Sequence, residues 1–527
     1  MTKGNHLGDA YATTLTRIKA QKGSRSRIGM EALMWVSNSE RPLHTTEICH
    51  ALGARIGSAD LDLENVPTIR TLLACSLGLI RVEESSSTVR LVHFSLQEYL
   101  SHNLSLFQSP HSMIAEVCLT YLNFRRVREL SPTLASAPST VPFAQYASGY
   151  WGEHMRRGGA GNMSPFALEL LIEFEQHVSS QLLLVRYYEE VRWWEPRFDN
   201  SDGPRGFTGL HGAAFFGMVE TVATLLAMRE WDINATDARG RTALAWAAAG
   251  GHEDVVAMIL QQKGAKANTR DTEYGLTPLW LAAAYGNEGV VKLLEREDVN
   301  PNTTHTECGW TPLLLAVENG CEGMARLLLE RGEIDPNIAD IKYGQTPLLW
   351  AAKGGYERVV RLLLKRGDTN PNTADRYGWV PLMCAAQGGH EGVVRLLLER
   401  DDINPNTSDT EYGWTPLLWA VDCGYEGIVD LLLERDDVNP GIPNPNGQTA
   451  LQLAVSRGHT RVAELLSASK PSFPVAEDID AAPNHFLPDP SDLLQSLSQP
   501  PRRFRFRHLN PFRRIPNPSS AGRSAFS

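Results

Sequence analysis

The 527-residue sequence has few cysteines, no long apolar run and no phosphate-binding loop. Its seven cysteines are scattered and never form a C-x-x-C pair, which argues against a disulfide framework or a zinc finger. No stretch approaches the roughly 18 uninterrupted apolar residues of a membrane span, and Met1 to Ala20 lacks the apolar block of a secretory signal. We therefore expect a soluble protein of the cytoplasm or nucleus that makes no membrane contact.

The charge is unevenly distributed along the chain. Apolar residues make up 42% and charged residues 21%, ordinary values that exclude collagen, a mostly disordered chain and a coiled-coil rod. The net charge is -11; residues 207–470 carry 35 acidic and 23 basic side chains, whereas residues 501–527 carry seven arginines and no acid. Because an acidic body repels phosphates, we expect nucleic-acid binding at most through the basic segment Arg502–Arg507.

A unit of 34 or 35 residues recurs eight times. Its starts are Thr208, Thr242, Thr277, Thr311, Thr346, Val380, Thr415 and Thr449. A glycine follows nine residues after every start, at Gly217, Gly251, Gly286, Gly320, Gly355, Gly389, Gly424 and Gly458. Such regularity indicates stacked copies of one structural unit.

Each unit reads as two short helices followed by a loop. In Thr277-Pro278 the hydroxyl can cap a helix start, and the proline occupies the first helical position at no cost. The helix ends at the glycine, which tolerates a left-handed backbone. A second helix follows, with apolar residues at helical spacing as in residues 359–364, and then a loop rich in Asn, Pro, Asp and Gly.

The unit resembles the ankyrin repeat, with its T-P-L-H-x-A-A-x-x-G and V-V-x-L-L-L pattern. The resemblance implies a solenoid of stacked helix pairs that binds proteins and is not an enzyme. The histidine of that pattern survives only as His211. Elsewhere its place is taken by Ala245, Trp280, Leu314, Leu349, Met383, Leu418 and Gln452. We expect apolar packing to replace the histidine's hydrogen bond in most repeats.

The N-terminal region is predicted to fold as helices followed by a hairpin. Residues 79–82 and 89–92 form its two expected strands, so we expect a winged-helix-like module. The segments around Arg41-Pro42-Leu43 and Val92 to Leu100 resemble the region after the nucleotide-binding module in fungal NACHT-ankyrin proteins, which are similar in plan to NOD-like receptors. Pro142 to Ala147, with Trp151-Gly152, continues the resemblance into a helical connector.

A NACHT module needs a glycine-rich loop ending in Gly-Lys-Ser or Gly-Lys-Thr to hold the phosphates, and the sequence contains neither. We therefore expect no nucleotide and no other cofactor. The chain starts about where that module would end, which leaves two alternatives: a shortened relative, or a chain whose upstream part is missing.

Several histidines lie where a catalytic or metal-binding role could be considered, and each has a structural explanation. His93 lies two residues before Ser95, but no Gly-x-Ser-x-Gly elbow frames the serine, so we expect a buried structural histidine. His252, His390 and His459 follow the helix-ending glycine of separate repeats, where we expect them to cap helices and not to bind a metal.

The paired acidic residues of the loops are also expected to be structural. Asp401-Asp402 and Asp436-Asp437 could imitate glycosidase carboxylates, but they recur at the repeat spacing, which favours solvated loop charges. We therefore expect neither a catalytic site nor a metal site.

The predicted fold is all-helical, with five parts. They are an N-terminal helical segment (1–26), a winged-helix-like module (27–130), a helical connector (131–206), eight ankyrin repeats (207–470) and a disordered tail (471–527). The tail is rich in Pro and Ser. Its interleaved arginines and phenylalanines could stack on single-stranded nucleic acid or dock on an acidic surface, although a solvated tail is the simpler interpretation.

Tryptophans are the predicted partner-binding residues. Trp246, Trp350 and Trp419 precede the small-residue pair of the first helix, where the ankyrin pattern faces the groove, and Trp280 lies one position earlier in its repeat. Trp310, Trp379 and Trp414 each follow a loop glycine. Tryptophan is enriched at binding hot spots, although these rings could instead pack between repeats.

The leading hypothesis is a scaffold or recognition subunit for an unidentified protein, acting through the groove and the loop tips. One alternative is the sensor part of a NACHT-type switch whose ATPase lies upstream or on another chain. A weaker alternative is a nucleic-acid-associated regulator that acts through the basic tail.

Overall fold

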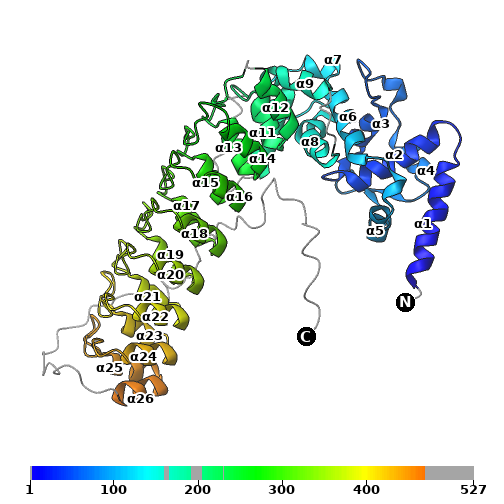
Figure 1. Cartoon of the computed structure of the whole chain (residues 1–527). Helices are drawn as coiled ribbons and strands as arrows, with labels where there is room; N and C mark the ends of the chain where they lie inside the picture. Colours follow the sequence, from blue (N-terminus) through cyan, green and yellow to red (C-terminus); the bar gives the residue numbers. More distant parts are fainter. Residues whose placement is uncertain (1–2, 160–164, 191–203, 229–230, 469–527) are drawn as a thin grey trace. The chain divides into compact units, whose positions relative to one another are not determined.

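The computed structural model describes residues 3–159, 165–190, 204–228 and 231–468 (Figure 1). These residues fall into two compact units, divided between Lys266 and Ala267. The predicted disordered tail, 471–527, lies outside the described residues. The fold is mostly helical, and the strands of the described residues form one small sheet.

The first unit begins with helices around this sheet. Its first elements are α1 (Lys3–Lys19), α2 (Ser24–Asn38), β1 (Leu43–His44), α3 (Thr45–Gly53), η1 (Leu63–Asn65), α4 (Ile69–Cys75), β2 (Ile80–Glu83) and β3 (Thr88–Leu91). The strands are antiparallel in the order β1-β3-β2, and the expected hairpin is present as β2 and β3. These elements follow the order expected of a winged helix: a helix, a short strand, two helices and a hairpin. That this region is a winged-helix module stays a prediction.

The helices that follow bury an aromatic cluster. They are α5 (Phe94–His102), η2 (Leu104–Leu106), α6 (Pro110–Leu122), α7 (Arg125–Arg128), α8 (Ala144–Arg157), α9 (Pro165–Ile172), η3 (Phe174–Gln176) and α10 (Val178–Glu190). Helix α6 packs along α8. The Phe143 ring lies edge-on to Trp35 at 5.5 Å and to Tyr121 at 5.1 Å, and stacks on Tyr146. All four side chains are buried, which ties α2, α6 and α8 together.

The first unit ends with the first two repeats, α11 (Gly209–Phe216) with α12 (Val219–Ala227) and α13 (Ala243–Gly250) with α14 (Glu253–Leu260). Helices α8 and α9 pack on α11. A Cβ at Gly209 would lie 2.2 Å from the Leu171 carbonyl oxygen, and one at Gly152 would lie 2.1 Å from the Phe216 ring. These glycines therefore permit the close contact that covers the open side of the first repeat.

The second unit contains the remaining six repeats, each an inner helix followed by an outer helix. Their bounds are α15 (Pro278–Ala284) and α16 (Glu288–Leu293), α17 (Pro312–Glu318) and α18 (Glu322–Leu329), α19 (Pro347–Lys353) and α20 (Glu357–Leu364), α21 (Pro381–Gln387) and α22 (Glu391–Leu398), α23 (Pro416–Asp422) and α24 (Glu426–Leu433), α25 (Ala450–Arg457) and α26 (Thr460–Ala468). Inner helices pack on inner helices and outer on outer, so a continuous apolar core runs between the two rows.

The repeat signals of the sequence act as expected. Oγ1 of Thr277, Thr346 and Thr415 accepts the third helical N–H, at 3.2, 3.3 and 3.3 Å. All eight repeat glycines have a left-handed backbone, with φ between 61° and 77°. Val380 occupies the cap position of α21 without a side-chain hydrogen bond, and it is buried.

We expect Val380→Thr to stabilise the protein by about 0.5–2 kcal/mol, because the hydroxyl gains the free N–H at the start of α21 at nearly unchanged shape. Urea unfolding of the full chain measures the gain. The reverse change, Thr346→Val, is the matched control and should cost a similar amount. A loss of stability in Val380→Thr would show that apolar packing has replaced capping at this position.

An asparagine ladder, formed by Asn268, Asn302, Asn337, Asn372 and Asn406, joins the loops of the second unit. Each Oδ1 accepts a backbone N–H of the following repeat, at 2.8–3.0 Å. Each Nδ2 donates to a backbone carbonyl of the same neighbour. Arginines add a second link: Arg331 donates to the carbonyls of Leu294 and Val299, both at 3.0 Å.

Candidate binding surface

The tryptophans expected in the groove lie in the interior. Trp246, Trp350 and Trp419 are 0%, 8% and 6% exposed. The indole N–H of each donates to an aspartate in the loop that precedes its own inner helix. The acceptors are Asp237 at 2.9 Å, Asp340 at 3.2 Å and Asp409 at 3.2 Å. The rings thus fasten each loop to its inner helix, and their role in partner binding stays a prediction.

We call the loop between one outer helix and the next inner helix a finger, and its aspartate organises the turn. Oδ1 of Asp409 accepts the N–H of Glu411 at 3.0 Å, and Oδ2 accepts the N–H of Trp414 at 3.1 Å. Oδ1 of Asp340 accepts the N–H of Tyr343 at 2.6 Å. The buried carboxylate therefore satisfies the amides that a tight turn leaves without partners.

In the repeat that contains Trp280, the expectation that apolar packing replaces the hydrogen bond of the pattern histidine is wrong. Nε2 of His211 lies 3.1 Å from the carbonyl oxygen of Arg241, the residue before the next repeat start. The indole N–H of Trp280 donates to the carbonyl of Trp310, the equivalent residue, at 2.9 Å. The larger ring is 3% exposed and preserves the bond between a helix and the following finger.

The loop tryptophans pack on those of the inner helices. The ring centroid of Trp310 lies 5.9 Å from that of Trp350. Those of Trp379 and Trp414 lie 5.0 and 4.7 Å from that of Trp419. Trp414 is buried, whereas Trp310 and Trp379 are half-buried. The structure therefore brings five of the seven predicted residues into two aromatic groups and leaves only two partly accessible.

The finger tips, defined as the two residues after the finger aspartate or its equivalent His305, differ in chemistry along the second unit. Three tips have the same sequence: Thr272-Glu273, Thr306-Glu307 and Thr410-Glu411. Between them, two fingers depart from it. One has Ile341-Lys342; the other is one residue shorter and has only Arg376 before Tyr377, which takes the place of Tyr274, Tyr343 and Tyr412. Two neighbouring fingers thus carry a cation and an exposed apolar side chain where the others carry Thr-Glu.

These four residues, which we call the tip surface, are exposed and held side by side. Ile341 is 50% and Tyr377 46% exposed, and Lys342 and Arg376 are exposed as well. The backbone N–H of Arg376 donates to the Tyr343 carbonyl at 2.9 Å, which joins the two fingers. The sequence analysis missed this surface. A comparison of tip positions between repeats, in place of a search for aromatics, would have revealed it.

Comparison with known protein families agrees with this architecture. The family described as ankyrin repeats (3 copies) matches in seven overlapping segments that together span residues 181–478, more than half of the chain. The chain belongs to the ankyrin-repeat family. No curated protein matches it.

Solved ankyrin structures are also similar to parts of this chain. The ankyrin domain of Bcl-3, titled a unique member of the IkappaB protein family, is 26% identical, with 43% of this chain and 99% of that one covered and a TM-score of 0.38. An ankyrin repeat domain from Acinetobacter baumannii AYE is 32% identical, with coverages of 36% and 97% and a TM-score of 0.34.

The ankyrin histidines after the helix-ending glycines were predicted to cap helices, and they cap the C-terminal end of the inner helix of the preceding repeat. His252 and His390 also occupy the N-cap positions of α14 and α22, where they make no side-chain capping bond. Nε2 of each ring is instead hydrogen-bonded to an inner-helix carbonyl of the preceding repeat: Phe215 at 2.9 Å and Lys353 at 3.2 Å. His459 contacts the Asp422 carbonyl in the same way, at 3.1 Å.

His93 was predicted incorrectly, as a buried histidine between core residues. It is exposed, and its Nδ1 accepts the Ser95 N–H at 3.2 Å, which caps α5. Its neighbour Phe94 is 68% exposed. Helix capping explains the close His93–Ser95 pair without catalysis.

The described residues were also compared with the requirements of a membrane span and of a metal site. Within the described residues, no helix combines the length and apolar character needed to cross a bilayer. One group of metal-ligand side chains, Glu40, His111 and His154, converges in the first unit. These residues are far apart in sequence and form no spaced motif, so they could not be predicted as a group.

Proposed function

We propose that this ankyrin protein is an interaction scaffold or recognition subunit that binds a protein through the tip surface. Ankyrin repeats are generally protein–protein interaction modules. The observation that carries the finer proposal is the change from Thr-Glu tips to Ile341-Lys342 and Arg376-Tyr377 at two adjacent fingers. Contiguous exposed apolar patches with a polar rim mark interaction sites on folded proteins.

The chemistry of the tip surface indicates its partner. Two cations beside two apolar side chains suit a segment that presents a carboxylate next to an apolar residue. The acidic tips at Glu307 and Glu411 flank the surface and would repel such a segment if it shifted by one finger, so they define its register. Two half-buried tryptophans lie nearby in the sequence: Trp310 in the preceding finger and Trp379 in the same finger as Tyr377.

The cysteines support a reducing compartment, as proposed for a cytoplasmic or nuclear protein. Six of the seven, Cys49, Cys75, Cys118, Cys308, Cys384 and Cys423, are free thiols, and Cys423 is exposed. Secreted proteins commonly pair such thiols as disulfides. The winged-helix-like module remains a proposal that rests on the order of α2, β1, α3, α4, β2 and β3. Its relation to NACHT-type proteins remains a proposal that rests on the segments around Arg41-Pro42-Leu43 and Val92 to Leu100.

The test is loss of partner binding on charge reversal of the tips. We expect Lys342→Glu with Arg376→Glu to weaken binding of a partner captured by the full chain at least tenfold, measured with both proteins purified. Binding to the wild type should also weaken with salt, because rim charges are screened. Ile341→Ser with Tyr377→Ser should weaken it independently.

A matched control changes the flanking tips. Glu307→Lys with Glu411→Lys reverses the same number of charges on the flanking tips and should preserve or strengthen binding. All variants should unfold at the wild-type temperature, because their side chains are exposed. Unchanged affinity in both tip variants would refute the proposal and direct attention to the helical faces of the array.

A further inference from the structure

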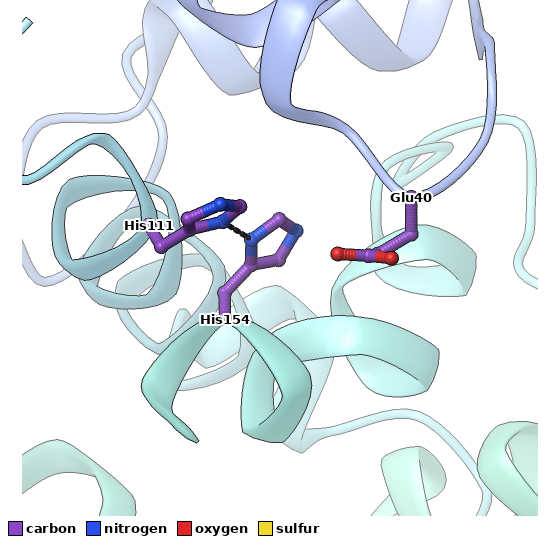
Figure 2. Close-up of side chains that lie close together, drawn as sticks. All are labelled: Glu40, His111 and His154. Carbon is purple, nitrogen blue, oxygen red and sulfur yellow. Dashed lines mark hydrogen bonds between the residues drawn. The ribbon is translucent and has the colours of Figure 1, made fainter. Parts of the chain in front are cut away.

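Three side chains of the kinds that bind transition metals converge in the first unit. Figure 2 shows Glu40, which follows α2, together with His111 at the start of α6 and His154 near the end of α8. One ligand atom from each lies within 4.8 Å of the other two. The two Nδ1 atoms are 2.8 Å apart and share a hydrogen bond. The group therefore joins three separate segments of the chain.

The orientation of His154 is fixed by a second layer of contacts. Its Nε2 is hydrogen-bonded to the Tyr146 hydroxyl at 2.9 Å, and the ring is fully buried. The same hydroxyl accepts the backbone N–H of Glu40 at 3.0 Å. Because Nε2 is occupied, Nδ1 is the atom presented to His111. Metal-binding histidines are held in this way, by a hydrogen bond at the nitrogen that does not bind the ion.

The Glu40 carboxylate is buried and lies among charged side chains. It is 9% exposed and pairs with Arg157 at 2.9 Å. Glu153, Arg156 and Arg186 also act on Glu40. One carboxylate oxygen pairs with Arg157, and the carboxylate lies beside two imidazoles, which are ligand types that zinc binds.

We propose that Glu40, His111 and His154 bind one divalent transition-metal ion of the zinc type. Two nitrogens and one oxygen suit zinc, whereas calcium and magnesium prefer oxygen ligands alone. Zinc bonds of about 2.0–2.1 Å place two tetrahedral ligands roughly 3.3 Å apart. The two Nδ1 atoms therefore separate by about half an ångström, and the Glu40 oxygen, now within 4.8 Å of the other ligand atoms, turns toward them. The ion replaces their shared proton and ties α6 and α8 to the segment after α2.

The test uses the full chain, stripped of metal by a chelator and titrated with Zn²⁺ by calorimetry. We expect one Zn²⁺ per chain with a submicromolar dissociation constant. His111→Ala and Glu40→Gln should each weaken binding at least tenfold. His102→Ala, which removes an exposed histidine of α5, is the matched control and should bind as the wild type does.

Substitution with Co²⁺ identifies the ligands. The expected visible bands of four-coordinate cobalt without thiolate charge-transfer absorption distinguish this site from binding at the seven cysteines. Thermal melts show that the variants are folded, and Zn²⁺ should raise the midpoint of the wild type but not of His111→Ala. The proposal is overturned if the wild type takes up no stoichiometric zinc, or if both site variants bind zinc with wild-type affinity.

Discussion

Asp409→Ala is expected to destabilise the ankyrin array by about 3–5 kcal/mol. The carboxylate is 3% exposed and accepts the N–H groups of Glu411 and Trp414 and the indole N–H of Trp419. Alanine leaves these buried donors without an acceptor, and each unmade bond costs about 1–3 kcal/mol. Urea unfolding of the full chain, followed by tryptophan fluorescence, measures the loss.

Two comparisons separate hydrogen bonding from charge and from packing. Asp436→Ala removes an exposed aspartate of the following loop and should change the free energy of unfolding by less than about 0.5 kcal/mol. Trp419→Phe keeps a ring but removes its N–H, and should cost part of what Asp409→Ala costs. Equal, small effects in Asp409→Ala and Asp436→Ala would show that the finger does not depend on its buried carboxylate.

The first unit is expected to lose stability in mild acid. Burial lowers the pKa of His177 and of His252 to about 4 in the folded protein. An unfolded histidine titrates near 6.5, so the unfolded chain binds protons that the folded chain does not. Stability is therefore complete above about pH 6.5 and falls as the pH drops toward 4. At about 1.4 kcal/mol per pH unit, each histidine contributes a loss of about 3 kcal/mol at pH 4.

Urea unfolding between pH 7.5 and 4 measures this loss. His252→Gln should remove the share of the loss that belongs to this histidine, about 3 kcal/mol at pH 4, at some cost in stability at neutral pH because the bond to Phe215 changes. His102→Gln, at an exposed position, should leave the slope as it is. An unfolding free energy that stays constant from pH 6.5 to 4.5 would contradict the assignment of neutral, buried histidines.

The repeats were predictable because their signals are local and recur. The threonine caps, the first-turn prolines and the left-handed glycines act within a few residues, so the eight units could be located by spacing alone. The hairpin of the N-terminal region was predictable for the same reason. The helical character of the connector could be expected, but its packing on α11 through Gly152 and Gly209 could not, since that contact joins distant segments.

The functional residues were harder to predict because burial depends on tertiary contacts. A tryptophan on an inner helix can face the groove or a finger aspartate. The residues around Trp350 in the sequence are compatible with both orientations of its ring. The partner of Trp280 lies 30 residues away in the next finger. Likewise, Glu40, His111 and His154 come together only through the packing of α6 on α8.

The asparagine ladder has a consequence for how this array can change in length. Each asparagine requires only the backbone of the next loop, and the loop it contacts carries the next asparagine of the series. Removal or duplication of a complete repeat therefore leaves a ladder without gaps, whereas an insertion within one loop separates an asparagine from both of its partners. Proteins related to this one should accordingly differ from it by whole repeats far more often than by short insertions in the loops between helices.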